Sequence, residues 1–127
     1  MSVSTVLVVE DDPLALKLFV TLVERNGYRA LAAADGREAL QIFSYERPHV
    51  LVLDLVMPYM SGLEVLQVVR STPALRAMRV LVLTARPAFL SQAIALGVEG
   101  WLTKPVLASQ FLAALQQVMD DLPSVTY

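Results

Sequence analysis

Charged and hydroxyl side chains stand where short apolar runs of this sequence end. They are Glu10, Asp11 and Asp12 after the run 5–9, Asp54 after the run 50–53, Thr84 after the run 80–83 and Lys104 after the run 100–102. Carboxylates that lie close together repel one another unless a cation or a proton intervenes. An acidic cluster without Cys or His suits a hard cation, and Mg²⁺ is the intracellular candidate. A carboxylate beside Mg²⁺, a lysine and a hydroxyl has the groups needed to accept a phosphoryl group.

The apolar runs have the pattern of strands in a parallel sheet. Thr5–Val9, Val50–Leu53 and Val80–Leu83 are short and rich in β-branched and aliphatic residues, which is typical of strands covered on both faces. Arg29–Ala33 is a weaker, alanine-rich candidate that suits an edge, and Gly100–Leu102 is a brief fifth strand.

Helices are predicted after each of these strands. Three of them begin at capping patterns, namely Asp12-Pro13, Asp35-Gly36-Arg37-Glu38 and Ser61-Gly62-Leu63-Glu64. We expect helices over residues 14–26, 35–46, 61–70, 87–96 and 107–122. The first helix should bury a broad apolar face that includes Leu14 and Leu18.

This alternation predicts an α/β fold with a doubly wound, flavodoxin-like (βα)5 sheet. Five parallel strands with right-handed crossovers close most simply in the order 2-1-3-4-5. The carboxyl ends of parallel strands lie at one edge, and strands one and three are neighbours in this order. Glu10, Asp11 and Asp54 should therefore converge. We expect one domain over residues 1–122, and a tail or the start of a linker over residues 123–127.

Composition restricts the classes of partner. The chain is 56% hydrophobic with a mean hydropathy of +0.57, but no apolar run approaches the roughly 18 residues of a membrane helix. We expect no membrane insertion, and no signal peptide in the start MSVSTVLVVEDD, which lacks a basic leader. The absence of cysteine fits the reducing cytoplasm. With a net charge of −2, the chain lacks the excess of positive charge that direct nucleic-acid binding requires, and we expect none.

Four motifs in this order resemble the receiver domain of two-component response regulators. They are Glu10-Asp11-Asp12-Pro13, Asp54-Leu55-Val56-Met57-Pro58, Thr84-Ala85 and Lys104-Pro105. The similarity covers about residues 4–122. It implies a phosphorylation-operated signalling switch rather than an enzyme, one that assists only its own phosphorylation and dephosphorylation.

The resemblance assigns a role to each acidic residue of the cluster. Asp54 would be the phosphoacceptor, receiving a phosphoryl group from a histidine kinase or a phosphotransfer protein. Asp11 and Asp54 would bind Mg²⁺, and Glu10 would assist, often through water. The backbone carbonyl of Val56 would complete the protein's share of the metal shell.

The same resemblance implies how a phosphoryl group would be sensed. Thr84 would donate a hydrogen bond to a phosphoryl oxygen, and Lys104 would pair with it. Trp101 stands where the family usually has a Tyr or Phe that moves with the threonine. The Lys104–Pro105 peptide bond would be cis. The change would reach the face made by residues 87–96, 100–102 and 107–122, which would regulate an unknown output partner or domain.

Two departures from the family pattern concern this output face. Lys104 follows Thr84 by 20 residues, fewer than usual, so the helix 87–96 or its entering loop is shortened. The last helix is poor in charge, which disfavours a salt-bridged dimer. An apolar contact through Phe89, Trp101 or Phe111 stays open.

Three other readings compete with the phosphorylated switch. A degenerate receiver would keep the fold as a binding module without phosphorylation. A Mg²⁺-dependent phosphatase on a similar sheet would need a second acid where Val56 stands. A nucleotide or flavin site is disfavoured, because neither GxxxxGK[ST] nor GxGxxG follows any strand.

Overall fold

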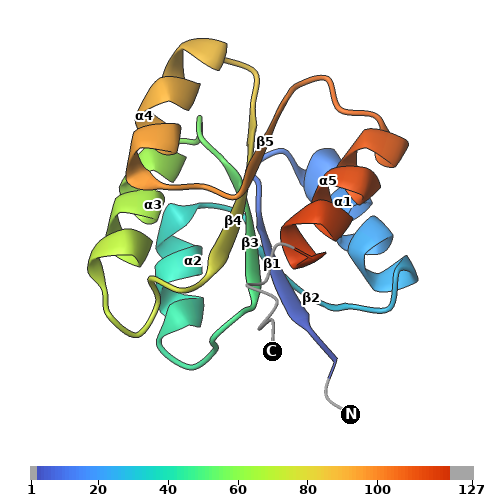
Figure 1. The fold of residues 1–127 in the computed structure, drawn as a ribbon, viewed down its shortest axis with the longest axis horizontal. Coiled ribbons are helices and arrows are strands. Elements are labelled where there is room, and N and C mark those ends of the chain that lie inside the picture. The colour runs from blue at the N-terminus through green and yellow to red at the C-terminus, as the bar shows by residue number, and fades with distance from the viewer. Residues whose placement is uncertain (1–2, 121–127) are drawn as a thin grey trace, which may run out of the picture.

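A five-stranded parallel sheet forms the middle layer of the molecule (Figure 1). The computed structural model describes residues 3–120. Its strands are β1 (Thr5–Val9), β2 (Arg29–Ala33), β3 (Val50–Asp54), β4 (Arg79–Thr84) and β5 (Gly100–Thr103). They pair in the order β2-β1-β3-β4-β5, which confirms the predicted fold class and strand order. The three inner strands are buried along their whole length, because helices cover both of their faces.

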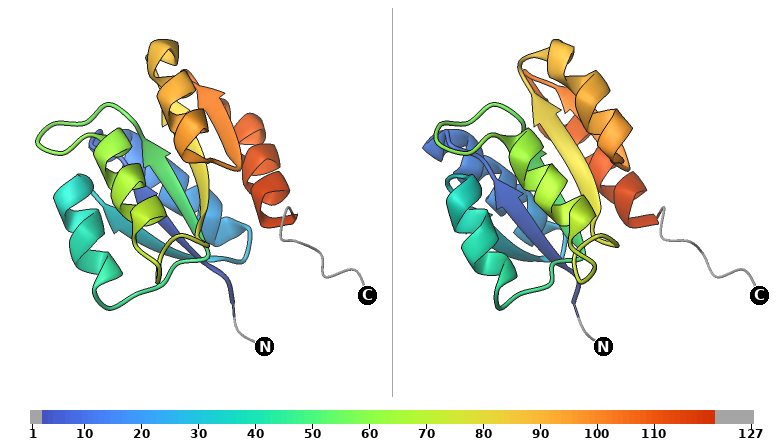
Figure 2. Two further views of the ribbon diagram at one scale, coloured as in Figure 1. Left: turned by 60° about the vertical axis from the view of Figure 1, so that its left-hand side comes forward. Right: turned by 90° about the vertical axis from the view of Figure 1, so that its left-hand side faces the viewer.

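Helices flank the sheet on both faces (Figures 1 and 2). One face is covered by α1 (Pro13–Arg25) and α5 (Ala108–Asp120), and the other by α2 (Gly36–Phe43), α3 (Gly62–Ser71) and α4 (Leu90–Leu96). A 3-10 turn, η1 (Pro87–Phe89), precedes α4. None of the helices within residues 3–120 is long and apolar enough to cross a membrane.

Several predicted helix limits differ from the structure. Helix α2 ends at Phe43 rather than near residue 46, because the N–H groups of Ser44 and Tyr45 donate to carbonyls three residues back, which closes the helix in a tighter turn. The single helix expected over 87–96 is divided into η1 and α4. The last two positions of the helix expected over 107–122, and the expected tail 123–127, lie outside the described residues.

Helix α1 packs on the sheet through a narrower face than its sequence suggests. Phe19 and Val23 are buried, and the Phe19 ring lies 4.7 Å from the ring of Phe111 on α5, centroid to centroid. Leu14 and Leu18 are 80% and 47% exposed. The expectation that both leucines belong to the buried face is therefore wrong, since the ring contact turns their side of the helix toward solvent.

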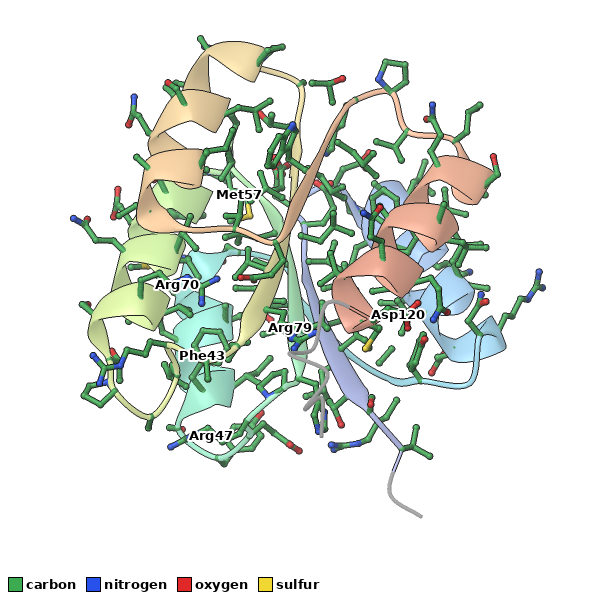
Figure 3. The ribbon with its side chains drawn as sticks, viewed as in Figure 1. Phe43, Arg47, Met57, Arg70, Arg79 and Asp120 are labelled. Carbon is green, nitrogen blue, oxygen red and sulfur yellow. The ribbon has the colours of Figure 1, made fainter. Side chains whose placement is uncertain are left out.

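The amino end of β4 is tied to the carboxyl end of α5. Arg79 is 7% exposed, and its Nη1 donates hydrogen bonds to the carbonyls of Val118, at 2.8 Å, and Met119, at 3.2 Å (Figure 3). The last carbonyls of a helix have no partner within the helix itself. Arg79 thus caps α5 from the interior and fixes it against the strand that ends at Thr84.

We predict that Arg79→Met lowers the free energy of unfolding by about 1–3 kcal/mol, the usual cost of buried polar groups that lose their partner. Urea unfolding followed by far-UV circular dichroism measures this change. Arg76→Met is the matched control, because Arg76 is exposed in the loop just before β4. Equal losses in the two variants would show that the α5 cap contributes nothing specific.

Candidate functional site

The carboxyl edge of the sheet brings together the acids singled out from the sequence. β1 and β3 are paired in register, with Val9 opposite Leu53, so the residues that follow them emerge side by side. Glu10, Asp11 and Asp54 each place a carboxylate oxygen within 4.8 Å of the others. Asp12 points elsewhere and caps α1 by accepting a hydrogen bond from the Leu14 N–H at 3.2 Å.

The Lys104 ammonium lies between two of these carboxylates. Its Nζ forms an ion pair with Glu10 Oε1 and a second one with Asp54 Oδ2 at 3.3 Å. Glu10 is only 1% exposed, and its other oxygen accepts a hydrogen bond from the Asp12 N–H at 3.0 Å. The cation that relieves the expected repulsion within this structure is therefore a side chain of the protein itself.

Burial and pairing act in opposite directions on these two groups. Burial raises the pKa of Glu10 above its usual value, although the hydrogen bonds from Lys104 and from the Asp12 backbone act to lower it. Burial acts to lower the pKa of Lys104, but the hydrogen bond to Glu10 and the charge of Asp54 outweigh it, so that this pKa is raised. Lys104 therefore remains a cation in its partly buried position.

The Asp54 carboxylate is held in a defined orientation at the end of β3. It is 4% exposed. Oδ1 accepts a hydrogen bond from the Val56 N–H at 3.1 Å, and Oδ2 faces Lys104. The chain then folds back so closely that a Cβ on Gly62 would collide with the carbonyl oxygen of Asp54. A glycine is required at this return.

Residues 55–61 form the loop between Asp54 and α3, which we call the acceptor loop. Its base is closed by the hydrogen bond from the Gly62 N–H to the Leu55 carbonyl at 3.0 Å. Met57 is buried in the core on the α3 side of the sheet (Figure 3), whereas Val56 is 37% exposed. The loop thus carries Val56 beside the acidic cluster while Met57 anchors it.

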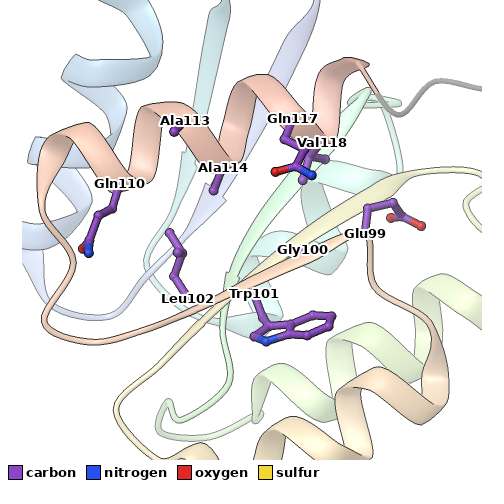
Figure 4. A pocket seen from close by; sticks show the side chains of 9 residues that line it. All are labelled: Glu99, Gly100, Trp101, Leu102, Gln110, Ala113, Ala114, Gln117 and Val118. Carbon is purple, nitrogen blue, oxygen red and sulfur yellow. The ribbon is translucent and has the colours of Figure 1, made fainter.

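Thr84 and Trp101 occupy different surroundings. Thr84 is fully buried, and its Oγ1 accepts a hydrogen bond from the Arg86 N–H at 2.9 Å and donates one to the Arg86 carbonyl at 3.3 Å. Trp101 is 48% exposed on the edge strand β5. It is one of the residues at a groove of about 310 Å³ between β5 and α5, and its indole lies on the side of β5 that faces away from α5 (Figure 4). In this structure the hydroxyl is engaged within its own loop, and the indole lies outside the core.

The Lys104–Pro105 peptide bond is cis. The Lys104 N–H donates to the Thr84 carbonyl at 2.8 Å, which joins the chain segments that follow β4 and β5. Lys104 and Thr84, which are far apart along the chain, therefore meet at the same edge of the sheet as the acids.

The arrangement provides oxygen ligands for a hard cation. The carboxylates of Glu10, Asp11 and Asp54 form an all-oxygen donor set of the type that Mg²⁺ prefers. The chemistry of these donors therefore fits the predicted metal. His49, which the sequence places before β3, takes no part, since its Nδ1 accepts from the Thr5 N–H at the amino edge of the sheet.

Sequence reasoning missed a contact at the tip of the acceptor loop. Tyr59 has a positive φ of 69° and is 78% exposed, and the guanidinium carbon of Arg37 lies 4.1 Å from the centroid of its ring. The two residues belong to different elements, so no local pattern connects them. Only the placement of Tyr directly after Met57-Pro58, where the chain must turn, hints at an unusual backbone.

Comparisons with known proteins agree with this geometry. Residues 6–116 match the family described as the response regulator receiver domain. Response regulator MprA of Mycolicibacterium vanbaalenii is 36% identical over 116 residues, which are 90% of this chain and 49% of MprA. The polar-differentiation response regulator DivK of Brucella anthropi is 30% identical over 122 residues, which are 92% of this chain and 97% of DivK.

Solved structures share the same fold. The chemotaxis response regulator CheY4 of Vibrio cholerae superposes with a TM-score of 0.86 at 33% identity, over 92% of this chain and 99% of CheY4. The bacteriophytochrome response regulator RtBRR gives a TM-score of 0.81 at 33% identity, over 92% of this chain and 78% of RtBRR. The chain thus spans about half of MprA and nearly all of DivK and CheY4. On sequence and fold together, this chain belongs to the receiver domains of two-component response regulators.

Proposed function

We propose that this receiver domain is a signalling switch that accepts a phosphoryl group on Asp54 in the presence of Mg²⁺. The observation that carries the proposal is the position of the Asp54 carboxylate, which lies within reach of two further acids and of the Lys104 ammonium. A degenerate receiver would not need this costly burial of charge. A phosphatase would need a second acid at the position that Val56 occupies.

The residues of the site can be assigned to the steps of phosphoryl transfer. Glu10, Asp11, Asp54 and the Val56 carbonyl would hold Mg²⁺, which supplies positive charge for the phosphoryl oxygens. An Asp54 oxygen attacks phosphorus, and the bond between phosphorus and the donor's leaving group, the imidazole nitrogen of a phosphohistidine, breaks. Lys104 then pairs with the transferred group.

Exposed leucines beside the acids suit a protein donor. Leu14 and Leu18 lie on the first turns of α1, directly after the acids, and Leu107 stands just before α5 and is 66% exposed. Both helices start at the carboxyl edge of the sheet and pack against each other (Figure 1). We assign this apolar rim to a histidine kinase or a phosphotransfer protein, which would place the chain in the cytoplasm.

The output is assigned to the face formed by α4, β5 and α5. Between Pro87 and Met119 the only charged residues are Glu99 and Lys104, and both are paired, Glu99 with Arg70 at 3.1 Å and Lys104 within the site. Charge depletion is the compositional mark of an interface core. Of the apolar side chains considered from the sequence, Phe111 is fully buried and excluded, whereas Trp101 reaches the surface.

The switch is proposed to operate through Thr84. A phosphoryl group at Asp54 adds roughly two negative charges and strong acceptor oxygens. The Thr84 hydroxyl would leave the Arg86 backbone to donate to it, and the loop after β4 would follow. Trp101, which is half exposed on the adjacent strand, would then move inward. Phosphorylation would thus shift the equilibrium between two arrangements, one with Thr84 bonded to Arg86 and Trp101 exposed, and one with Thr84 bonded to the phosphoryl group and Trp101 turned inward.

The first prediction concerns the acceptor. Acetyl phosphate with Mg²⁺ should add the mass of one phosphoryl group to the protein, and Asp54→Asn should abolish this addition, as measured by intact-mass spectrometry at neutral pH. Asp120→Asn, at the exposed end of α5, is the control and should behave as the wild type. Equal incorporation in wild type and Asp54→Asn would remove Asp54 from its role, and a wild type that binds Mg²⁺ without incorporation would favour the degenerate receiver.

The second prediction concerns Lys104. Lys104→Met should lower the stability of the metal-free protein by about 3 kcal/mol at pH 7.5, the lower end of the cost of removing one partner of a buried ion pair. Loss of Lys104 removes two influences that lower the pKa of Glu10, so the folded-state pKa rises further above the unfolded value. The folded protein then retains a proton that the unfolded chain releases, and stability falls as pH rises between these two pKa values.

Thermal melts at pH 5 and pH 7.5 in EDTA test this prediction. The loss caused by Lys104→Met should be smaller at pH 5, and Mg²⁺ should restore part of it by binding the native state. Lys17→Met on the exposed side of α1 is the control, since Lys17 is the other lysine of the chain. A loss that is the same at both pH values and unaffected by Mg²⁺ would contradict the shared site.

The third prediction concerns the switch. Mg²⁺ with beryllofluoride, a phosphoryl mimic, should change the fluorescence of Trp101, the only tryptophan of the chain. Thr84→Ala should lose most of this change while mimic binding, followed by calorimetry, persists. Thr21→Ala on α1 serves as the control. Constant emission in a wild type that demonstrably binds the mimic would exclude Trp101 from the response.

A further inference from the structure

The tip of the acceptor loop has an unfavourable backbone conformation. Tyr59 is the one non-glycine residue among residues 3–120 with a positive φ, and this region is disfavoured for a bulky side chain. Its ring is not buried, since Tyr59 is 78% exposed. Such a conformation persists only where surrounding contacts hold it, and the contact present here comes from another helix.

Arg37 on α2 covers the ring of Tyr59. Its guanidinium carbon lies 4.1 Å from the ring centroid, a distance typical of a cation–π contact. Arg37 Nη2 also lies 3.7 Å from Asp35 Oδ2. Asp35 is the N-cap of α2, with Oδ1 accepting from the Glu38 N–H at 3.0 Å. The Arg37 guanidinium, which contacts the loop, is thus itself paired with the N-cap residue of α2.

A second contact between α2 and the loop lies next to the first. A Cβ on Gly36 would stand 2.9 Å from Met60 Cβ and 2.8 Å from Val65 Cγ2, so the first turn of α2 lies directly against Met60. Met60 is half-buried beneath this turn, while Tyr59 lies outside under Arg37. The first turn of α2 therefore contacts two consecutive residues of the loop, Tyr59 and Met60.

The tip of the loop, together with its base and the buried Met57, restricts the stretch that contains Val56. The base of the loop is fixed by Gly62 and the Leu55 carbonyl, and Met60 N–H donates to the Pro58 carbonyl at 2.8 Å. With the base and the tip both fixed, the short stretch between them has little freedom. This stretch contains Val56, whose N–H already orients Asp54.

We propose that Arg37 is a positioning residue for the metal site, acting through Tyr59 to hold the acceptor loop in its metal-binding conformation. The proposal rests on the proposed function in that it assigns the Val56 carbonyl to Mg²⁺. A loop that is already ordered loses less conformational entropy when it binds a ligand. Removing the contact between Arg37 and Tyr59 should weaken Mg²⁺ binding without changing any ligand atom.

The affinity arm of the test is a calorimetric Mg²⁺ titration. Arg37→Ala should raise the Kd for Mg²⁺ about two- to five-fold, the range that an exposed cation–π contact can supply. Arg25→Ala is the matched control, because Arg25 is an exposed arginine in the last turn of α1, which begins at the carboxyl edge and ends away from the site. Equal affinities for Arg37→Ala and the wild type would overturn the proposal.

A mutant cycle tests whether Arg37 acts through Tyr59. Tyr59→Phe keeps the ring face and should retain wild-type affinity, whereas Tyr59→Leu should weaken binding as Arg37→Ala does. The Arg37→Ala/Tyr59→Leu double variant should be no weaker than either single variant, since the two changes remove one contact. Fully additive losses would show that Arg37 acts by another route and would contradict the proposal.

Amide hydrogen exchange in metal-free protein separates this proposal from the proposed function. Arg37→Ala should speed exchange of the amides of residues 55–62, while exchange in β1 and β3 and the metal-free melting temperature stay near the wild-type values. If the wild type binds no Mg²⁺, the metal role of the acidic cluster fails, and the exchange comparison still decides whether Arg37 orders the loop. Unchanged exchange in residues 55–62 would show that Arg37 does not order the acceptor loop and would overturn the proposal.

Discussion

The ion pairs of Lys104 with Glu10 and Asp54 are the interaction on which the site depends. A carboxylate that is almost fully buried is costly unless a cation and hydrogen bonds compensate it. Glu10 receives both, from Lys104 and from the Asp12 N–H. Because Glu10 follows β1, Asp54 ends β3 and Lys104 follows β5, one ammonium connects the centre of the sheet with its edge.

The same ammonium links the acidic cluster with the proposed response. Within this structure Lys104 stabilises the carboxylates, and its backbone N–H is bonded to the Thr84 carbonyl. A phosphoryl group on Asp54 would attract both the ammonium and the Thr84 hydroxyl, which is now bonded to the Arg86 backbone. Thr84 ends β4 and Lys104 follows the neighbouring β5, so under the proposed function a change at either residue would reach the edge strand that carries Trp101.

Two separate groups of exposed apolar residues lie on different elements of the structure. Leu14, Leu18 and Leu107 are exposed in the first two turns of α1 and just before α5, whereas Trp101 and Ile94 are exposed on β5 and α4. Under the proposed function, the first group would contact the phosphoryl donor and the second would contact the output partner.

The sequence by itself determined the strands, their order and the convergence of Glu10, Asp11 and Asp54, because apolar runs and crossover handedness depend on local pattern and chain connectivity. It did not determine which face of α1 is buried, since that depends on the contact between Phe19 and Phe111. Only the tertiary structure showed Lys104 between the acids and Arg37 over Tyr59. These pairings join residues from separate elements, and their geometry is set by packing that no local sequence pattern encodes.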